Sequence, residues 1–264
     1  MDDYTGRIVL VTGGSTGLGR AIAVGAAARG AHAVVVNYAR SEAEAHETAR
    51  QVEAAGAQGL LAQGDVAQDA DCARIVQAAE PFGRIDALFN NAGITKFAPN
   101  HADLDALTGE DFLRLYDVNV VGAWRMVKAA RTLLEAGETP GAVVNTSSIA
   151  GVTGIGSSVA YAASKGALTT LTLSLARALA PRIRVNAVCP GFIDTPWFAG
   201  MGEESRERLR QGVIASTPLK AASTAEDIAD AALFLASPQS RHVTGETLLV
   251  DAGTHLGFAS LGMR

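Results

Sequence analysis

Short apolar runs of strand length alternate with longer helical patterns along almost the whole of this 264-residue chain. Near-continuous apolar strands, each followed by a helix, are typical of a parallel sheet that helices cover on both faces. The sequence therefore predicts an α/β fold built on a doubly wound parallel sheet of about seven strands. The predicted strands cover Arg7–Thr12, His32–Asn37, Gln58–Gln63, Ala87–Asn90, Ala142–Thr146, Ile183–Val188 and Thr247–Val250.

The domain organisation follows from what does not interrupt this pattern. No stretch rich in Pro, Ser and Gly divides the chain, and no repeat of 20–50 residues is visible in it. We therefore expect one domain over residues 1–264. In a doubly wound sheet, ligands bind beyond the carboxyl ends of the strands, so the residues just after each strand are the candidates for a site.

Composition and charge exclude several classes of protein. The chain is 48% hydrophobic and 19% charged, which excludes a disordered chain. Its net charge is -5 and its 22 Lys and Arg are scattered, so we expect no nucleic-acid partner. No run approaches the roughly 20 apolar residues of a membrane span, and the first residues lack the basic start of a secretory signal. A cytoplasmic protein that needs no membrane is expected.

Cysteine and histidine spacing indicates no metal site. Cys72 and Cys189 form no CxxC pair, and we expect both to be reduced thiols in or near the core. The five histidines never occur at the spacing of metal ligands on a helix.

A glycine-rich loop, Thr12-Gly-Gly-Ser-Thr-Gly-Leu-Gly19, connects the first predicted strand to the first predicted helix. Glycines let the backbone turn sharply and bring its N–H groups close to a phosphate, and the helix N-terminus adds a partial positive charge. A glycine turn without a ligand is the alternative, but its place in an α/β pattern favours a dinucleotide. The loop and the strand pattern together indicate a Rossmann-type fold.

Tyr161 and Lys165 are four residues apart in a predicted helix, so both side chains lie on one face. A neighbouring ammonium favours a phenolate, and we expect Lys165 to lower the pKa of Tyr161 from its ordinary value of about 10. Ser148 follows a predicted strand and lies at its carboxyl end, beside the same crevice. The three residues predict an acid–base site, and the alternative is an ordinary surface pair on a helix.

The order and spacing of these motifs resemble the short-chain dehydrogenase/reductase family. The glycine loop has that family's T-G-x-x-x-G-x-G spacing, and the resemblance extends from Gly6 to Gly253. The further motifs are Asp65-Val66, Asn90-Asn-Ala-Gly93, Asn119, Ser148, Tyr161-x-x-x-Lys165, Pro190-Gly191 with Thr195, and the segment 243–251.

The resemblance implies an NAD(P)-dependent oxidoreductase that transfers a hydride between a nicotinamide and a carbonyl or secondary alcohol. It assigns Tyr161 to proton exchange with the substrate oxygen and Ser148 to a hydrogen bond with that oxygen. It assigns Lys165 to the nicotinamide ribose, and Asn119 to a water that connects Lys165 to solvent. The family spacing selects Ser148 over Ser147.

Substrate and class of function remain open at this point. The pattern is most similar to the 3-oxoacyl-carrier-protein reductases, but alcohol, sugar and steroid dehydrogenases share every motif named above. A non-catalytic dinucleotide sensor or scaffold is the alternative from another class. The complete set of Asn119, Ser148, Tyr161 and Lys165 argues against it, because a sensor does not need all four.

The end of the second predicted strand bears on the choice of cofactor. NAD-specific enzymes place a carboxylate there, whereas this chain has Asn37, Tyr38 and then Arg40. A missing carboxylate removes repulsion of a 2'-phosphate, Arg40 could pair with it, and Ser15 could add a hydroxyl. We therefore expect NADP(H) to be preferred over NAD(H). Against this, Thr16 stands where many NADP-dependent relatives carry a base, and Arg40 equally fits a solvated residue at a helix start.

The resemblance also implies the remaining cofactor contacts. It places the adenine between Asp65 and Val66, and the carboxamide beside Thr195. The expected cofactor-binding residues are Gly13, Ser15, Thr16, Gly17, Leu18, Gly19, Asn37, Tyr38, Arg40, Asp65, Val66, Asn91, Ala92, Gly93, Tyr161, Lys165, Pro190, Gly191, Ile193 and Thr195.

Residues 192–217 lie where the family has its mobile substrate lid. Apolar bulk gathers there at Phe192, Trp197, Phe198 and Met201, which fits either a hydrophobic carbonyl substrate or packing against a neighbouring subunit. Relatives are commonly tetramers that pair the helices near Asn119 and Tyr161, so a homotetramer is expected.

Overall fold

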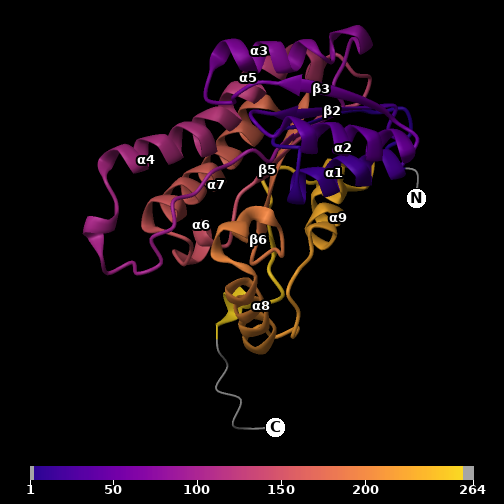
Figure 1. Ribbon diagram of the computed structural model, residues 1–264. Helices are drawn as coiled ribbons and strands as arrows, with labels where there is room; N and C mark the ends of the chain where they lie inside the picture. The colour runs from indigo at the N-terminus through magenta and orange to yellow at the C-terminus, as the bar shows by residue number, and fades with distance from the viewer. Residues whose placement is uncertain (1–2, 258–264) are drawn as a thin grey trace.

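The computed structural model describes residues 3–257, with Ala199 described by its backbone alone, and its centre is a seven-stranded sheet (Figure 1). All strand pairings are parallel, and the strand order is β3-β2-β1-β4-β5-β6-β7. The strands are β1 Ile8–Val11, β2 Ala33–Tyr38, β3 Gln58–Gln63, β4 Ala87–Asn90, β5 Gly141–Thr146, β6 Ile183–Pro190 and β7 Thr247–Val250. From β1 the strands are added outward to β3 on one side, and from β4 to β7 on the other side. This change of side between β1 and β4 is the doubly wound topology that the sequence predicted.

The predicted strands match the observed ones closely. The largest difference is at β6, which runs two residues beyond the predicted end, to Pro190. Cys189 and Pro190 pair there with Leu249 and Val250 of β7, so the neighbouring edge strand prolongs β6 toward the site.

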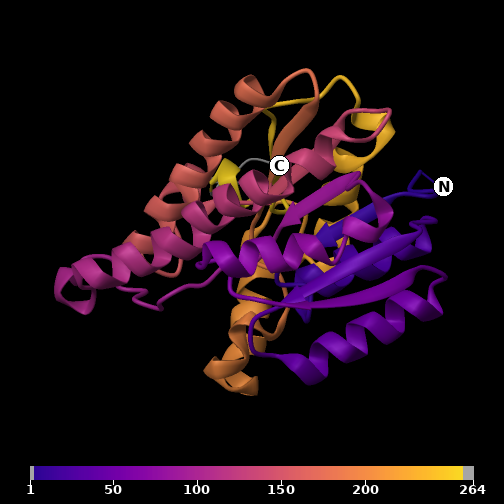
Figure 2. The same ribbon diagram turned by 90° about the horizontal axis from the view of Figure 1, so that it is seen from above.

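Six long helices cover the two faces of the sheet. One layer holds α1 Gly17–Ala28, α2 Glu42–Ala54 and α9 Ala225–Ala236, and the other holds α3 Asp69–Gln77, α5 Gly122–Glu135 and α7 Val159–Leu179 (Figure 1). The short helices are α4 Gly109–Tyr116 and α6 Ala150–Thr153, and a π-helical segment, Asp117–Val121, joins α4 to α5. Helix α8, Glu203–Ser216, projects from the body of the molecule in both views (Figures 1 and 2). Short 3-10 helices cover Glu80–Phe82, Leu104–Ala106, Pro196–Met201, Pro238–Ser240 and Thr254–Leu256.

The core has two halves, one on each face of the sheet, and β2 shows why. Val34 and Val36 pack in the half that contains Ile22 of α1, whereas Val35 packs in the half that contains Ile75 of α3. Successive side chains of a strand point to opposite faces, so a strand covered on both sides has to be apolar throughout. This explains the uninterrupted apolar runs of the sequence.

Two expectations about single residues and segments can be compared with the structure. Cys72 and Cys189 are buried free thiols, as predicted. No helix within residues 3–257 is long and apolar enough to cross a membrane.

Candidate active site

The glycine loop runs from the end of β1 into α1 with a backbone that only glycine fits. Gly13 and Gly17 have φ values of 60° and 52°, in the left-handed region. A Cβ atom on Gly19 would lie 2.1 Å from the carbonyl oxygen of Gly13, and one on Gly13 would lie 2.9 Å from the Cα of Ala92. Close approach of backbone to backbone therefore requires glycine at these positions.

The N-terminus of α1 presents uncapped N–H groups at this loop. Thr16 precedes the helix in an extended conformation, and its side chain makes no capping hydrogen bond. The first turn holds no acidic residue, while Leu18 is buried and anchors the helix below the loop. Free N–H groups and the helix dipole favour an anion at this place, as a dinucleotide pyrophosphate would supply.

Thr12 ties the glycine loop to the segment after β4. Its hydroxyl donates to the carbonyl of Phe89 and accepts hydrogen bonds of 3.0 Å from the N–H groups of Asn91 and Ala92. The Asn91 amide donates in turn to the carbonyls of Thr12 and Gly13. Two chain segments almost 80 residues apart thus form one surface. Sequence reasoning assigned no role to Thr12, although it belongs to the quoted motif.

Asn37 at the end of β2 is a positioning residue. Its amide nitrogen donates to the carbonyls of Ala62 and Gly64, each at 3.0 Å, and its amide oxygen accepts from the N–H of Gly13. The side chain is only 2% exposed, and these partners hold its amide. Asn37 can therefore affect cofactor binding only indirectly, because its amide fixes the position of the glycine loop.

The surface beside Asn37 carries the residues expected around a 2'-phosphate. Tyr38 is buried, Arg40 is exposed just after β2, and the backbone of Ser15 lies between α1 and α2. The Ser15 carbonyl accepts hydrogen bonds from the guanidinium of Arg20 and the hydroxyl of Thr48. Arg20 was missed by sequence reasoning, because its role depends on how α2 packs on α1.

The residues expected beside the adenine follow β3. Val66 is buried, and a Cβ on Gly122 of α5 would lie 2.9 Å from its side chain. Asp65 is exposed, and its carboxylate accepts a hydrogen bond from the N–H of Ala67. Gly93 borders the expected catalytic residues instead, because its Cβ would lie 3.2 Å from Asn119 Oδ1 and 3.6 Å from Lys165 Nζ.

Asn119 lies in the π-helical segment, a backbone form frequent at functional sites. Its side-chain oxygen accepts from the N–H of Ile94, and its nitrogen donates to the Ile94 carbonyl and to Ser164 Oγ. Ser164 Oγ donates to the carbonyl of Tyr161. Asn119 thereby joins the segment after β4 to the helix that carries the tyrosine.

Tyr161 and Lys165 lie on one face of α7, as predicted. The Lys165 ammonium is 5.6 Å from the centre of the Tyr161 ring and donates a 2.6 Å hydrogen bond to the carbonyl of Thr146. Lys165 is 4% exposed, and burial lowers its pKa to about 8. The end of β5 therefore holds the lysine at the base of the crevice.

The expected lowering of the Tyr161 pKa is wrong for this structure. Burial raises that pKa to about 12, and a hydrogen bond from Ser148 opposes the rise. The lysine ammonium is itself desolvated, and it is directed at Thr146 rather than at the phenol oxygen. A phenol that keeps its proton is a proton donor, which is the form that carbonyl reduction requires.

Ser148 is the serine that the family spacing selects, and its hydroxyl opposes the rise of the Tyr161 pKa. This hydroxyl accepts a hydrogen bond from the N–H of Ala150 at 3.1 Å. Ser147 is buried, and its hydroxyl bonds to the carbonyl of Lys165 and to Thr169 Oγ1, below the crevice.

The chain after β6 crosses the glycine loop. The carbonyl of Pro190 accepts from the N–H of Ile149, and Gly191 lies so close to β7 that its Cβ would be 2.8 Å from Asp251 Cβ. Ile193 pairs with Ser223 in an isolated bridge. Thr195 faces the loop, because a Cβ on Gly17 would lie 3.4 Å from Thr195 Cβ.

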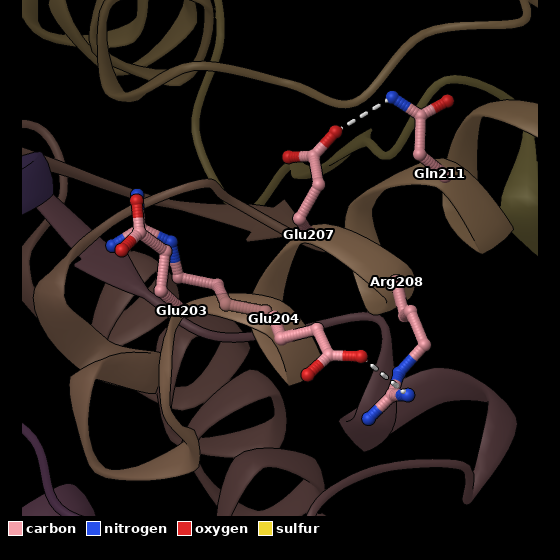
Figure 3. Close-up of a pocket in the computed structure, with 6 residues that line it drawn as sticks. Glu203, Glu204, Glu207, Arg208 and Gln211 are labelled. Carbon is pink, nitrogen blue, oxygen red and sulfur yellow. Dashed lines mark hydrogen bonds and ion pairs between the residues drawn. The ribbon is translucent and has the colours of Figure 1, made fainter.

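Helix α8 forms the later part of residues 192–217, the segment expected to be a substrate lid. Asp194 lies 3.4 Å from the guanidinium of Arg206 and 3.5 Å from that of Arg210, which attaches the helix to the start of this segment. A hollow on α8 is lined by charged and amide side chains that pair with each other, Glu204 with Arg208 and Glu207 with Gln211 (Figure 3). All residues that line this hollow belong to α8, so it is separate from the catalytic residues.

Comparison with known proteins agrees with this architecture. The family model described as enoyl-(acyl carrier protein) reductase matches residues 13–255. A Streptomyces violaceoruber protein that carries the name of a ketoacyl reductase of the granaticin polyketide synthase is 43% identical over 94% of this chain and 96% of its own. L-Rhamnose 1-dehydrogenase (NAD(P)(+)) of a Sphingomonas species is 38% identical over 95% of this chain and 97% of its own.

Among solved structures, a Burkholderia xenovorans protein named as a short-chain dehydrogenase/reductase superimposes with a TM-score of 0.87. It is 38% identical, and the match covers 96% of this chain and 99% of that one. The chain belongs to the short-chain dehydrogenase/reductase family. It is therefore an oxidoreductase of the kind that acts on CH–OH and C=O groups with a nicotinamide cofactor.

The residues present fit such a cofactor. The crowded glycines, the uncapped start of α1 and the close approach of Gly93 to Lys165 form a cradle that added Cβ atoms would fill. Within residues 3–257, no group of three or more His, Cys, Asp or Glu is placed to hold a metal ion.

Proposed function

We propose that this protein is a carbonyl reductase or alcohol dehydrogenase in which Tyr161 is the general acid and base. The observation that carries the proposal is the Lys165 ammonium, buried 5.6 Å from the centre of the Tyr161 ring, with Ser148 acting on the pKa of the same phenol. In the reductive direction the substrate oxygen accepts hydrogen bonds from both hydroxyls. Tyr161 gives its proton to that oxygen, and alcohol oxidation returns it.

The nicotinamide, when bound, supplies or accepts the hydride at the carbonyl carbon. We propose that Lys165 holds its ribose and that the glycine loop with α1 holds its pyrophosphate. Asn119 connects Ile94 to Ser164 of α7 by hydrogen bonds. We propose that it also anchors a water on the path from Lys165 to solvent. The other expected cofactor-binding residues follow the same edge of the sheet, on the loops after β1 to β4 and after β6.

We propose that NADP(H) is preferred over NAD(H). Asn37 and Tyr38 place no carboxylate at the end of β2, and the first acidic side chain after that strand is Glu42. The exposed Arg40 lies where it can reach a 2'-phosphate, with Ser15 on the opposite loop. An Arg40→Ala variant should therefore raise the KM for NADPH about tenfold and leave that for NADH nearly unchanged.

The substrate class is proposed more broadly than a single compound. One relative carries the name of a ketoacyl reductase and another that of a rhamnose dehydrogenase, so 3-oxoacyl groups and cyclic sugars are both candidates. We further propose a single domain over residues 1–264, with residues 192–217 as its substrate lid. Two free buried thiols fit a reducing compartment such as the cytoplasm.

A spectrophotometric screen tests the proposed function. A panel of carbonyls and alcohols is offered with NADPH or NADP+ and with NADH or NAD+, and absorbance of the reduced nicotinamide is followed. We expect turnover of at least one carbonyl, faster with NADPH. Cofactor binding without turnover of any member of the panel would support a dinucleotide sensor instead.

A further inference from the structure

Aromatic side chains gather around the catalytic tyrosine. Aromatic residues make up only 5% of the chain, yet five of them form two adjoining sets of ring contacts. The Trp197 ring centre is 6.3 Å from that of Tyr161. Phe198 stacks on Phe192 at 5.1 Å and lies at a tilt to Phe97, with ring centres 6.1 Å apart. We name these five residues the aromatic cluster: Phe97, Tyr161, Phe192, Trp197 and Phe198.

The cluster is assembled from three separate parts of the chain. Phe97 comes from the segment between β4 and α4, Tyr161 from α7, and the other three from the lid. The segment around Phe97 is held next to the start of α7, because the N–H of Ala98 donates to the carbonyl of Ser157 at 2.8 Å and Lys96 pairs with Asp111. The rings are thus presented by segments that are themselves anchored.

The position of Trp197 connects the cluster to the reaction. Its ring contacts the ring of Tyr161, which carries the proposed proton donor. A substrate with its oxygen at Tyr161 and Ser148 has its carbon frame beside Trp197. Trp197 and Phe97 still expose 42% and 47% of their surface, so apolar area remains for a ligand to cover.

The chemistry of these rings discriminates between ligands. Phenylalanine offers no hydrogen bond, and tryptophan has a single N–H donor. A polyol that binds against such rings gives up its hydrogen bonds to water and receives none in return. A flat aromatic ring instead gains edge-to-face or offset stacked contacts. Apolar chains cover the same area but lack these ring contacts.

We propose that the aromatic cluster selects flat, ring-bearing ketones and the corresponding secondary alcohols as substrates, with Trp197 and Phe97 as the specificity-determining residues. This inference rests on the proposed function, because it takes the substrate oxygen to lie at Tyr161 and Ser148.

Three ketones with the same number of carbon atoms test the inference: aromatic 2-tetralone, saturated 2-decalone and open-chain 2-decanone. We expect kcat/KM for 2-tetralone to exceed that for 2-decanone by about tenfold, with 2-decalone between them. Trp197→Leu and Phe97→Leu should each lower the preference for 2-tetralone roughly fivefold, mainly through KM. Phe234→Leu, at an equally exposed ring on α9, should leave the preference unchanged.

The ratio of kcat/KM for two substrates, measured on one variant, does not depend on the fraction of that variant that is folded. An unchanged ratio in both Trp197→Leu and Phe97→Leu overturns the inference. If the ratio is unchanged and both variants also dissociate in size-exclusion chromatography, the rings are a subunit contact. Reduction of 2-decanone or a sugar but not of 2-tetralone overturns this inference and leaves the proposed function intact. Turnover of no ketone with either cofactor overturns the proposed function as well.

Discussion

At the scale of single residues, burial is the main cause of the pKa shifts of Tyr161 and Lys165, the proposed catalytic groups. Tyr161 keeps its proton because burial raises its pKa to about 12, and Lys165 loses its proton more easily because burial lowers its pKa to about 8. Near neutral pH Tyr161 is therefore a protonated phenol. The neighbouring Lys165 is an ammonium whose pKa lies only about one unit above the pH.

The depressed pKa of Lys165 predicts a pH dependence of stability. Between pH 8 and the ordinary lysine value of about 10.5, the unfolded chain binds a proton that the folded chain has lost. Lys165 therefore makes the free energy of unfolding rise with pH in this window, by at most about 3 kcal/mol. Urea unfolding of the wild type and of Lys165→Met, at fixed protein concentration, measures the difference.

We expect the stability of the wild type relative to Lys165→Met to increase by about 2 kcal/mol between pH 8 and pH 10. Tyr161 acts in the opposite direction only above pH 10, where the folded chain keeps a proton that the unfolded chain loses. A difference that stays flat across this range contradicts a pKa of Lys165 near 8.

At the scale of elements, side-chain amides join parallel strands to the loops that follow them. Asn37 joins β2 to the end of β3 and to the glycine loop, and Asn119 joins the segment after β4 to α7. These links place the carboxyl ends of the strands in fixed relation to each other. The site is therefore a property of the sheet edge and not of one loop.

The role of Asn37 is tested by its conversion to a carboxylate. Asn37→Asp replaces an amide N–H2 by an oxygen that faces the carbonyls of Ala62 and Gly64. We expect a loss of about 3 kcal/mol in the free energy of unfolding, larger at pH 8 than at pH 5 because the carboxyl is then ionised. Gln63→Glu makes the same change at an exposed position in β3 and should cost under about 0.5 kcal/mol. Equal effects of the two substitutions refute a structural role for the Asn37 amide.

The strands and most of the site could be predicted from the sequence, because their signals are local. Apolar runs mark the strands, left-handed glycines mark the loop, and helical spacing places Tyr161 and Lys165 on one face. The long-range contacts could not be predicted. Lys165 donates to Thr146, and the ring of Phe97 contacts that of Phe198, about a hundred residues away. Such contacts depend on how loops cross the sheet edge, and no local pattern encodes them.

At the scale of the whole molecule, helices α4, α5 and α7 leave apolar side chains uncovered. Helices α4 and α7 lie side by side on the flank away from β1 to β3 (Figures 1 and 2). Leu113, Tyr116, Trp124 and Leu173 are all exposed on these helices. An apolar surface of this kind is typical of a subunit interface. It supports the proposed homotetramer, which pairs the helices near Asn119 and Tyr161.

Sedimentation equilibrium tests the assembly. We expect a mass of four chains of 27.2 kDa at micromolar concentration. Leu113→Asp combined with Trp124→Asp should lower that mass, because buried carboxylates oppose apolar association. Leu219→Asp, at an exposed position after α8, should leave it unchanged. A wild-type protein with the mass of one chain would contradict the proposal.

The proton-donor role of Tyr161 is tested most directly by Tyr161→Phe, which removes one oxygen atom. Titration of the variant with NADPH should give a Kd close to that of the wild type, because the glycine loop and Lys165 remain. Its kcat for carbonyl reduction should fall at least about 100-fold, the usual scale for a general acid. Normal cofactor binding with kcat within about threefold of the wild type would contradict the assignment of Tyr161 as the proton donor.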